Sequence, residues 1–489
     1  MKHIFKACLA SILLLLSACK SGYDFKTWPD TPVNHQLIVV AKTIDGVRAY
    51  GLSGAVPAYT SVFFEAAKHN QTVVAGVDGS FRLDLPLDDK SIVFGELTFS
   101  IGTAIYQKTY QIKDLAIALN KIAKSAFSLD QDIEDIAVVG SGVAILSPLA
   151  GLIKLHQLKP TWEIGDSTGS IALNPQAKPA LYPRMIATYG SKAVIPMFGS
   201  NELALIDLPS NKLTYSARLK EADTDNAERV IAIDEQTYLA SFVNFRQFSD
   251  PAKNQPAILG PGMIALLRIQ GESIVTENIL ALPYKNPQFF KLVSPTEIWV
   301  SCTGAFSDLS GTSLSSVDAG LVKIGLSTDK KTLSINHHIA LTNFTPAEPE
   351  VLNGKLIIPE AWGTRLAILD QSASGLSQTD IKPSSFHRPF NFTFATYFHG
   401  DIIFLGDAQG ALIAYSLSEG FFPFPFVEPI NLVTDQSQKI RLNPSKIMFR
   451  HREESRTLNS KHIGGFSAWV LSPSQHKIIP LDLLEVFGP

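Results

Sequence analysis

Cysteine is almost missing from this chain of 489 residues, which contains three: Cys8, Cys19 and Cys302. The first two lie near the N-terminus, ahead of every segment with a folding pattern. Only Cys302 is left for the folded part, so no internal disulfide can stabilise that part. Cys302 follows an alternating run that starts at Glu297, which predicts a buried, unreactive thiol in a strand.

An excess of positive charge and long apolar runs are also lacking. The 42 Lys and Arg residues stand against 45 Asp and Glu, a formal charge of −3 that gives no basic surface for nucleic acid. No apolar run beyond Cys19 reaches the about 20 residues that a membrane-spanning helix requires. With 45% hydrophobic and 18% charged residues, the composition is typical of a well-packed, strand-rich protein. The length predicts two domains or one large repeat architecture.

The first eighteen residues have the pattern of an export signal. Lys2 and Lys6 precede an apolar run at residues 12–16, and small residues follow up to Cys19. The order Leu-Ser-Ala-Cys resembles the lipobox of bacterial lipoproteins. This resemblance implies that residues 1–18 are a signal peptide and that Cys19 carries acyl chains such as palmitate, which attach the protein to a membrane. Lys20, where some lipoproteins have Asp, implies the outer membrane, with the side left open. The alternative is an ordinary secretory signal with an unrelated cysteine.

A tether and a small domain are predicted next. Residues 19–34 lack periodicity and suit a tether. Residues 35–112 contain short β-rich runs separated by turn signals such as Asp78-Gly79, which predicts a small β-sandwich. The segment from Gly54 and the run that leads through Asp78-Gly79 to Leu83 resemble carboxypeptidase-regulatory-like or transthyretin-like Ig-type domains. The resemblance implies a spacer or adhesive module.

A helical linker is predicted at residues 113–132, because Leu115, Leu119, Ile122 and Ala126 recur at helical spacing. The alternative is that a last strand ends near Leu115 and the remainder is irregular linker.

From residue 133 to residue 489 a loose repeat recurs every 40 to 55 residues or so, roughly the length of a propeller blade. Sheets of this size cannot bury both faces alone, so we expect them to pack radially in a closed ring. The segment 199–208 resembles the YVTN-type propeller repeat, and 401–417 resembles quinoprotein-type and WD40-like repeats. The predicted fold is therefore all-β, with an Ig-like sandwich followed by a seven-bladed β-propeller. The candidate units are residues 135–156, 189–213, 230–269, 297–324, 354–370, 400–417 and 468–483.

Several local patterns suggest chemistry but are better explained by structure. Gly165-Asp-Ser167-Thr-Gly169 matches a hydrolase motif, yet no helix pattern follows, so a turn is expected. His337 and His338 would point to opposite faces of a strand and cannot bind one metal ion. Residues 221–226 lack the glycine of a calcium loop and predict a loop between blades. We therefore predict no catalytic residue, no metal site and no cofactor.

Two further features are structural expectations. Asp207, Asp370 and Asp482 each end an apolar run and are expected to accept hydrogen bonds from the following turn. Residues 421–427 alternate Phe and Pro and either pack against the ring or form an exposed apolar patch for a partner.

Two functions fit these patterns. The first is a noncatalytic binding module that presents a propeller face to a protein, peptide or glycan. The second is a propeller enzyme, such as a quinoprotein dehydrogenase, a lactonase or a glycan lyase. A dense polar cluster with shifted pKa values in the channel would favour the enzyme, and an apolar channel would favour binding. Positions near predicted strand ends give the candidate contact residues Asn244, Arg246, Glu360, Trp362, Arg388 and His399.

Overall fold

The computed structural model divides into two compact units, Met1–Asp114 and Leu115–Pro489. The predicted signal peptide, nearly all of the tether and most of the predicted helical linker lie outside the described residues. No helix in the part of the chain that the structure describes is long and apolar enough to cross a membrane. The described residues are 33–111 and 126–481, except 35–36, 44–45, 52–53, 67–68, 87–93, 102–103, 130–131, 174–181, 222–223, 249, 256, 306–316, 362, 371–391, 400, 409, 419, 422–429, 433–444 and 450–467.

The first unit contains two antiparallel sheets with a shared core. One sheet has the order β1-β2-β5 and the other has the order β4-β3-β6-β7. Ala49 and Leu83 from the first sheet pack with Val62 and Phe64 from the second, all of them inaccessible to solvent. The relationship to Ig-type domains stays a prediction. The strands are β1 (Ile38–Thr43), β2 (Gly46–Gly51), β3 (Ser61–Ala66), β4 (His69–Val74), β5 (Phe81–Pro86), β6 (Phe94–Ile101) and β7 (Ala104–Gln111).

The predicted turn at Asp78-Gly79 is present in this unit. Asp78 Oδ1 accepts a hydrogen bond from Ser80 N at 3.0 Å. Gly79 has a φ of +79°, and a Cβ atom there would lie 1.9 Å from the carbonyl oxygen of Val56. Only glycine fits both conditions, because L-residues rarely adopt this φ and the clash involves backbone.

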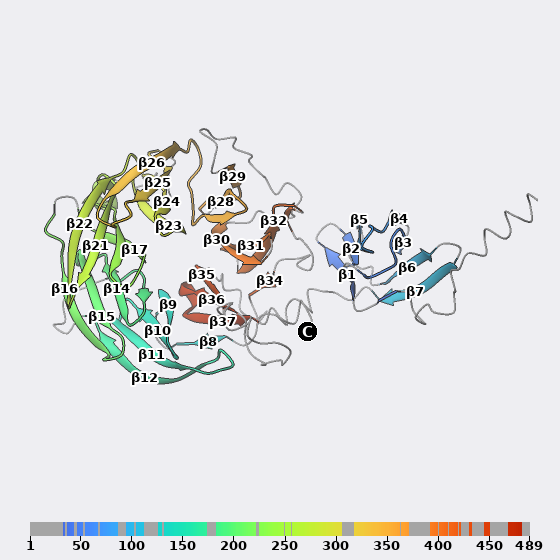
Figure 1. Cartoon of the computed structure of the whole chain (residues 1–489), viewed down its shortest axis with the longest axis horizontal. Helices are drawn as coiled ribbons and strands as arrows, with labels where there is room; N and C mark the ends of the chain where they lie inside the picture. The colour runs from blue at the N-terminus through green and yellow to red at the C-terminus, as the bar shows by residue number, and fades with distance from the viewer. Residues whose placement is uncertain are drawn as a thin grey trace, which may run out of the picture. The chain divides into compact units, whose positions relative to one another are not determined.

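The second unit is a seven-bladed β-propeller, as the repeat predicted (Figure 1). Each blade is an antiparallel sheet, and its strands follow one another from the inside outward, except that the outer strand of the last blade is β8 (Phe127–Ser128), from the start of the unit. The inner strands are β9 (Asp135–Val139), β13 (Ala187–Tyr189), β17 (Ala227–Ala232), β23 (Pro287–Ser294), β27 (Glu350–Leu352), β30 (Phe392–His399) and β35 (Lys446–Phe449).

The second and third strands of the blades form the middle of the sheets. The second strands are β10 (Gly142–Ser147), β14 (Lys192–Met197), β18 (Thr237–Phe242), β24 (Glu297–Cys302), β28 (Lys355–Pro359), β31 (Ile402–Asp407) and β36 (Ala468–Ser472). The third strands are β11 (Leu152–Leu158), β15 (Glu202–Asp207), β21 (Met263–Gln270), β25 (Gly320–Leu326), β29 (Leu366–Asp370), β32 (Ala411–Ser416) and β37 (Lys477–Leu481).

The outer strands complete the blades. They are β12 (Ile164–Ala172), β16 (Lys212–Ala217), β22 (Ser273–Ala281), β26 (Leu333–Ala340), β33 (Gly420–Phe421) and β8 (Phe127–Ser128). The fifth blade has three strands within the described residues, and β34 (Ile430–Asn431) pairs with β32 in the sixth. A short hairpin, β19 (Phe245–Gln247) and β20 (Ile258–Leu259), is inserted between β18 and β21.

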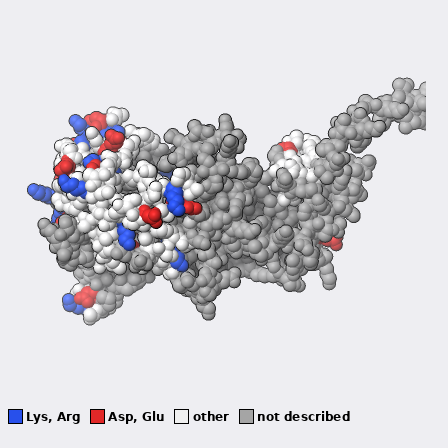
Figure 2. Space-filling view, turned by 90° about the horizontal axis from the view of Figure 1, so that it is seen from below, with Lys and Arg blue, Asp and Glu red and all other residues white. Residues whose placement is uncertain are grey.

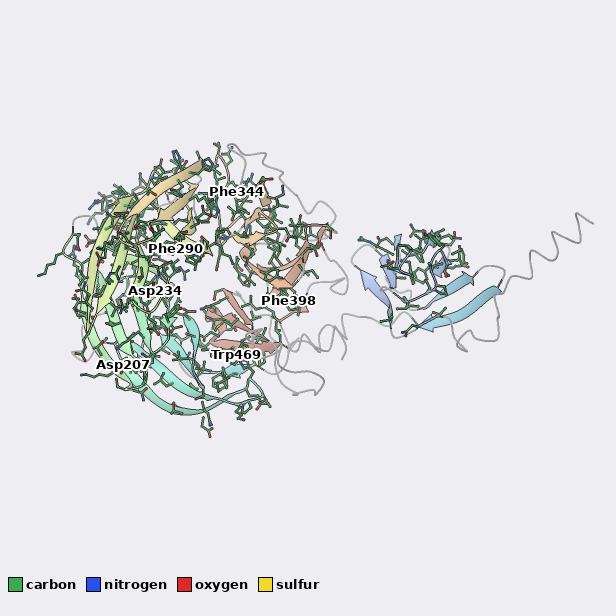
Figure 3. All side chains as sticks on the ribbon, viewed as in Figure 1. Asp207, Asp234, Phe290, Phe344, Phe398 and Trp469 are labelled. Carbon is green, nitrogen blue, oxygen red and sulfur yellow. The ribbon has the colours of Figure 1, made fainter. Side chains whose placement is uncertain are left out.

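Radial packing explains why the middle strands are apolar on both sides. Every residue of β18 and of β32 is buried, because each sheet lies between two neighbours. The core consists of seven hydrophobic clusters, and each cluster joins two consecutive blades. Phe290, Phe344 and Trp469 mark three of these seams (Figure 3). This arrangement is the ring that the sequence predicted.

The ring closes where the N-terminal strand of the unit joins the last blade. β8 pairs with β37, with Ser128 opposite Lys477. At the same seam Trp469 stacks on Trp162 with ring centroids 4.4 Å apart, and Trp469 Nε1 donates a hydrogen bond to Trp162 O at 3.1 Å. The sequence placed Phe127 and Ser128 in a helical linker, whereas they form a strand. The pairing partner lies at the far end of the chain, so local periodicity could not indicate it.

One local prediction was wrong and others hold. Ser167 lies inside β12 and not in a turn, and its hydroxyl donates to Leu155 O at 3.3 Å. His337 and His338 have different neighbours: His337 lies edge-on to Trp299, and His338 hydrogen-bonds Tyr284. Residues 221–226 lie between β16 and β17, which belong to neighbouring blades, as predicted for a loop between blades.

The predictions for the three aspartates and for the Phe-Pro segment can be compared with the structure only where these residues are described. Asp207 accepts hydrogen bonds from Ser210 N at 3.3 Å and from Lys192 Nζ at 3.0 Å, so the turn role is confirmed there. Asp370 accepts from Lys355 Nζ at 2.9 Å, while its following turn and Asp482 lie outside the described residues. In the Phe-Pro segment, Phe421 packs on Tyr415, and residues 422–427 lie outside the described residues.

Cys302 should be chemically silent in the native protein. It is fully buried in the seam between the third and fourth blades, and burial raises the pKa of its thiol. Because the thiolate is the reactive species, we expect no alkylation by iodoacetamide at pH 8 without denaturant and complete alkylation in denaturant. Mass spectrometry of the tryptic peptide measures both. Labelling of the native protein at the rate of a free thiol would contradict the burial.

Candidate functional site at the propeller channel

The inner strands of all seven blades begin at the same end of the propeller axis. Neighbouring inner strands contact one another around that axis (Figure 1). We call the end at which they begin the channel mouth. Antiparallel pairing brings the ends of the second strands to the same end, since Ala227 at the start of β17 lies opposite Phe242 at the end of β18. Loops between second and third strands therefore also lie at the channel mouth.

Charged side chains occur at or shortly before the start of most inner strands, and Lys291 lies midway along β23. Acids and cations are interspersed around the axis, and six of the seven blades contribute at least one. We call this set the channel belt: Glu134, Asp135, Arg184, Glu228, Arg229, Lys291, Glu348, Glu350 and Lys446. Because charges of both signs are present, most members of the belt can form ion pairs with one another.

Asp135 joins three blades through its carboxylate. Its Oδ1 accepts from Lys446 Nζ at 2.8 Å, which links the first blade to the seventh. Its Oδ2 accepts from the backbone N–H of Ile186 at 2.8 Å, which links the first blade to the second. The side chain is only 6% exposed. A buried carboxylate is stable here because each oxygen has a donor.

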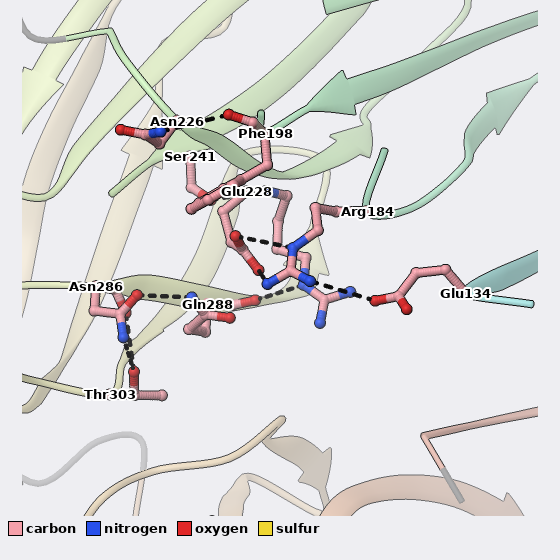
Figure 4. A network of polar contacts seen from close by, with 10 residues as sticks. Glu134, Arg184, Phe198, Asn226, Glu228, Ser241, Asn286, Gln288 and Thr303 are labelled. Carbon is pink, nitrogen blue, oxygen red and sulfur yellow. Dashed lines mark hydrogen bonds and ion pairs between the residues drawn. The ribbon is translucent and has the colours of Figure 1, made fainter. Parts of the chain in front are cut away.

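Arg184 forms the next link, between the first and third blades (Figure 4). Its Nε and Nη2 contact the two carboxylate oxygens of Glu228 at 3.3 Å and 3.2 Å, and its Nη1 lies 3.7 Å from Glu134 Oε1. The Glu228 carboxylate raises the pKa of Arg184. Burial raises the pKa of Glu134, and the charge of Arg184 opposes that rise. The guanidinium therefore stays charged and holds two acids.

Glu350 connects the fourth, fifth and sixth blades. Its carboxylate forms an ion pair with Lys291 and accepts a hydrogen bond from Tyr397 N at 2.6 Å. The side chain of Glu350 is 3% exposed, whereas that of Lys291 is 28% exposed. The acid of this pair is therefore buried, whereas the lysine is partly exposed.

Two members of the belt are left without an opposite charge in contact. Arg229 donates through Nε to Gln288 O at 3.0 Å and lies over the Phe289 ring at 5.4 Å. Glu348 forms no hydrogen bond or ion pair through its carboxyl group with any residue that the structure describes. Burial raises the pKa of Glu348, and the charges of Arg229, Lys291 and Lys446 oppose that rise. These cations come from three blades, which places Glu348 near the axis.

An aromatic shelf lies beside the belt at the channel mouth. Phe245 stacks on Phe248 at 4.7 Å, and Phe198 meets Phe245 edge-on at 5.7 Å. Arg184 lies over the Phe198 ring at 5.2 Å and so connects this shelf to the belt. Phe248 is 60% exposed. We define the aromatic shelf as Phe198, Phe245 and Phe248.

The residues predicted from strand ends fall at different places. Asn244 is fully buried, and its amide accepts from Asp225 N and donates to Pro261 O, both at 2.8 Å. Arg246 is exposed on β19, next to the shelf. Glu360, at the end of β28, forms an ion pair with Arg365. All three lie at the channel mouth.

The other three predicted residues give less information. His399 ends β30, at the opposite end of the axis from the mouth. Trp362 and Arg388 lie outside the described residues. Binding by these six positions stays a prediction. Sequence reasoning missed the belt, although a signal existed: charged residues at the start of otherwise apolar strands, as in Asp135 and Glu350.

On the side of the molecule seen in Figure 2, basic and acidic side chains are interspersed over the described surface. No group of three or more His, Cys, Asp or Glu residues within the described ranges is arranged to hold a metal ion.

Comparisons with known proteins give no family. No protein-family model matches the chain, and no curated protein matches it. Similar solved structures include hydrazine synthase of Kuenenia stuttgartiensis, with a TM-score of 0.48 and 8% identity over 73% of this chain and 97% of that one. The RRP9 WD40 repeats give 0.46 and 10% identity over 74% of this chain and 98% of that one. The N-terminal domain of Nup159 gives 0.44 and 10% over 74% and 91%. Because these TM-scores are all below 0.5, the assignment of the propeller fold rests on the sheet topology of this chain.

Proposed function

We propose that this protein is a lipoprotein of the bacterial outer membrane, held by lipid on Cys19, and that its propeller is a noncatalytic binding module. The partner is a protein, peptide or glycan, and it binds at the channel mouth. The sandwich unit acts as a spacer between membrane and propeller. The signal and lipobox pattern supports the anchor, and the surface of the mouth supports the binding role.

One observation carries the binding role: an exposed aromatic shelf adjoins a charged belt at one end of the propeller. Phe248 at 60% and Ile258 at 48% exposure lie in the inserted hairpin, outside the sheets of the blades. An insertion that is not needed for blade packing, yet exposes apolar side chains, is typical of a contact surface. Aromatic and arginine side chains such as Phe248 and Arg246 are enriched at protein interfaces.

The enzyme alternative has one observation in its favour. The belt is a polar cluster in the channel, and two of its acids, Glu134 and Glu348, have a raised pKa. Most belt charges, however, are occupied in holding neighbouring blades together, as in the contacts of Asp135 and Glu350. A ligand recovered chemically unchanged after long incubation would support binding, and a modified ligand would support the enzyme.

Site-specific photo-crosslinking in cells tests the proposed surface. A photoreactive amino acid replaces Phe248 at the mouth or, as a matched control, Tyr189, which ends β13 at the opposite end and is 44% exposed. We expect a discrete adduct from position 248 and none from position 189. Adducts of equal yield from both positions, or none from position 248, would refute the mouth as the binding surface.

The anchor has its own test. Cells that express the wild type or Cys19→Ser are labelled with radioactive palmitate and then fractionated. We expect label and outer-membrane location for the wild type and neither for the variant. Stable anchoring requires more than one acyl chain, so loss of the acylated cysteine should release the protein. Equal membrane association of both proteins would rule out the lipid anchor.

Gly260→Ala should weaken partner binding without unfolding the propeller. A Cβ atom at Gly260 would lie 2.6 Å from Asn244 O and 2.7 Å from Arg246 Nε, so the inserted hairpin must shift. We expect a crosslinking yield at position 248 reduced by about threefold or more, which corresponds to roughly 0.7 kcal/mol. Gly271→Ala is the control for a strained backbone away from the hairpin, because Gly271 has a φ of +63° but nothing lies within 4 Å of its Cβ position. Equal yields in the two variants would contradict the role of the hairpin.

A further inference from the structure

We propose that Arg229 and Glu348 form a subsite in the channel mouth that receives a carboxylate group of the partner. Arg229 would bind the carboxylate, and the charge on Glu348 would control how tightly it binds. The inference rests on the proposed function and adds the chemical group that is recognised. Such a group is the C-terminus or an acidic side chain of a protein or peptide.

Arg229 has donors to spare and is held in place. Its Nε is used by Gln288 O at 3.0 Å, and the face of the guanidinium lies over Phe289. The two Nη atoms make no hydrogen bond to a residue within the described part of the chain. A planar guanidinium with free Nη donors matches the two oxygens of a carboxylate.

Arg229 also faces the axis. Its charge acts on Glu134 in the first blade and on Glu348 in the fifth, although Arg229 itself belongs to the third blade. A side chain that influences groups on both sides of the ring must project into the channel. A ligand entering at the mouth would therefore meet the free Nη atoms.

Around Glu348 itself, cations outnumber acids, which favours an anion over a cation at this place. Glu348 is surrounded by Arg229 from β17, Lys291 from β23 and Lys446 from β35, with Glu350 from β27 as the other acid. Glu350 is paired with Lys291, and Lys446 is paired with Asp135. An ammonium group at Glu348 would be repelled by three nearby cations, whereas a carboxylate at Arg229 would be opposed by Glu348 and by Glu134, of which Glu134 contacts Arg184 at 3.7 Å.

Glu348 makes the subsite sensitive to pH. Burial raises the pKa of its carboxyl group above the usual value, so acidification from neutral pH neutralises Glu348 before ordinary glutamates. The neutral group no longer repels a bound carboxylate, and its O–H can donate to it. Affinity for a carboxylate should thus rise as the pH falls, as long as the ligand stays ionised.

The test uses a matched pair of small probes with the full chain in detergent. N-acetylglycine carries a carboxylate, and N-acetylglycinamide is its neutral analogue. Saturation-transfer NMR titrations at pH 7 and pH 5.5 measure their dissociation constants for the wild type, Arg229→Gln and Glu348→Gln. Arg268→Gln is the control, because Arg268 lies on the third strand of the same blade and pairs with Glu277 at 2.9 Å.

We expect the acid to bind the wild type more tightly than the amide, and more tightly at pH 5.5 than at pH 7. Arg229→Gln should weaken the acid by about tenfold, while Arg268→Gln leaves it unchanged. Glu348→Gln should strengthen binding at pH 7 by about threefold or more and remove the pH dependence. The Glu348→Gln result keeps the test valid even if Arg229→Gln fails to fold.

Acid and amide binding with equal affinity, an unaltered affinity in Arg229→Gln, or a weaker affinity in Glu348→Gln would each overturn the subsite. The outcome is separable from that of the proposed function. A crosslinked partner at position 248 without carboxylate preference removes the subsite alone. Carboxylate binding without any crosslink at position 248 removes the proposed macromolecular partner alone.

Discussion

Trp469→Ala is expected to destabilise the propeller by about 3–5 kcal/mol, the usual cost of truncating a buried tryptophan. Trp469 is 1% exposed and stacks on Trp162 across the seam at which the last blade meets the first. Its indole N–H also donates to Trp162 O across that seam. The substitution leaves a cavity and removes a hydrogen bond at the place where the ring closes. Urea unfolding followed by far-UV circular dichroism measures the loss.

Leu149→Ala is the control for Trp469→Ala. Leu149 is 80% exposed, so its truncation should change the free energy of unfolding by no more than about 0.5 kcal/mol. If Trp469→Ala lost as little as this control, Trp469 would not be packed in a closing seam, and the account of the ring would fail at that point.

Asp135→Ala is expected to cost about 2–4 kcal/mol. The substitution leaves the buried N–H of Ile186 without an acceptor and Lys446 without its counter-charge. Lys446 is 35% exposed, so water can solvate part of its charge. Most of the loss should therefore come from the buried N–H. Asp135→Asn keeps an acceptor and should lose roughly half as much.

An exposed ion pair provides the comparison for the two Asp135 variants. Asp318 pairs with Lys285 at 3.0 Å, but its side chain is 45% exposed. Asp318→Asn should change the stability by less than about 1 kcal/mol, because exposed pairs contribute little and asparagine tolerates the φ of +58° at this position. Urea unfolding of the three variants at pH 7 gives the ranking Asp135→Ala, Asp135→Asn, Asp318→Asn. An equal loss for Asp135→Asn and Asp318→Asn would show that the belt does not hold the blades together.

The propeller could be predicted from the sequence because the middle strands carry the signal. Segments such as 202–207 and 402–407 are buried between two blades and read as short apolar runs that end in Asp. Seven such units were visible, and the structure has seven blades. The burial of Cys302 followed from the same alternation.

The closing strand could not be predicted, because its partner is remote. Phe127 and Ser128 pair with a strand that starts at Lys477, so only the folded ring brings them together. A helical spacing through Ala126 was the stronger local pattern. Ser167 illustrates the same limit. A turn was predicted there because no helix pattern follows the hydrolase-like motif, whereas Ser167 pairs with β11 as part of a strand.

The channel belt was hidden for a related reason. Lys446 and Asp135 are 311 positions apart in the chain and hydrogen-bond only because the first and last blades are neighbours. Arg246 and Glu360, which were predicted from strand ends, lie at the mouth, and their role in binding stays a prediction. Charged residues at the starts of inner strands, such as Asp135, converge on one axis only in the folded ring.

Closure of the ring by β8 can be tested with a designed disulfide. Ser128 and Lys477 lie opposite each other in an antiparallel pair, at a separation that a disulfide can span. The full chain with Ser128→Cys and Lys477→Cys should form the crosslink under mild oxidation, as mass spectrometry of the linked peptides would show. Ser128→Cys with Ser472→Cys, one strand further in, should not form it. Crosslinking in neither protein, or equally in both, would contradict a propeller closed by its own N-terminal strand.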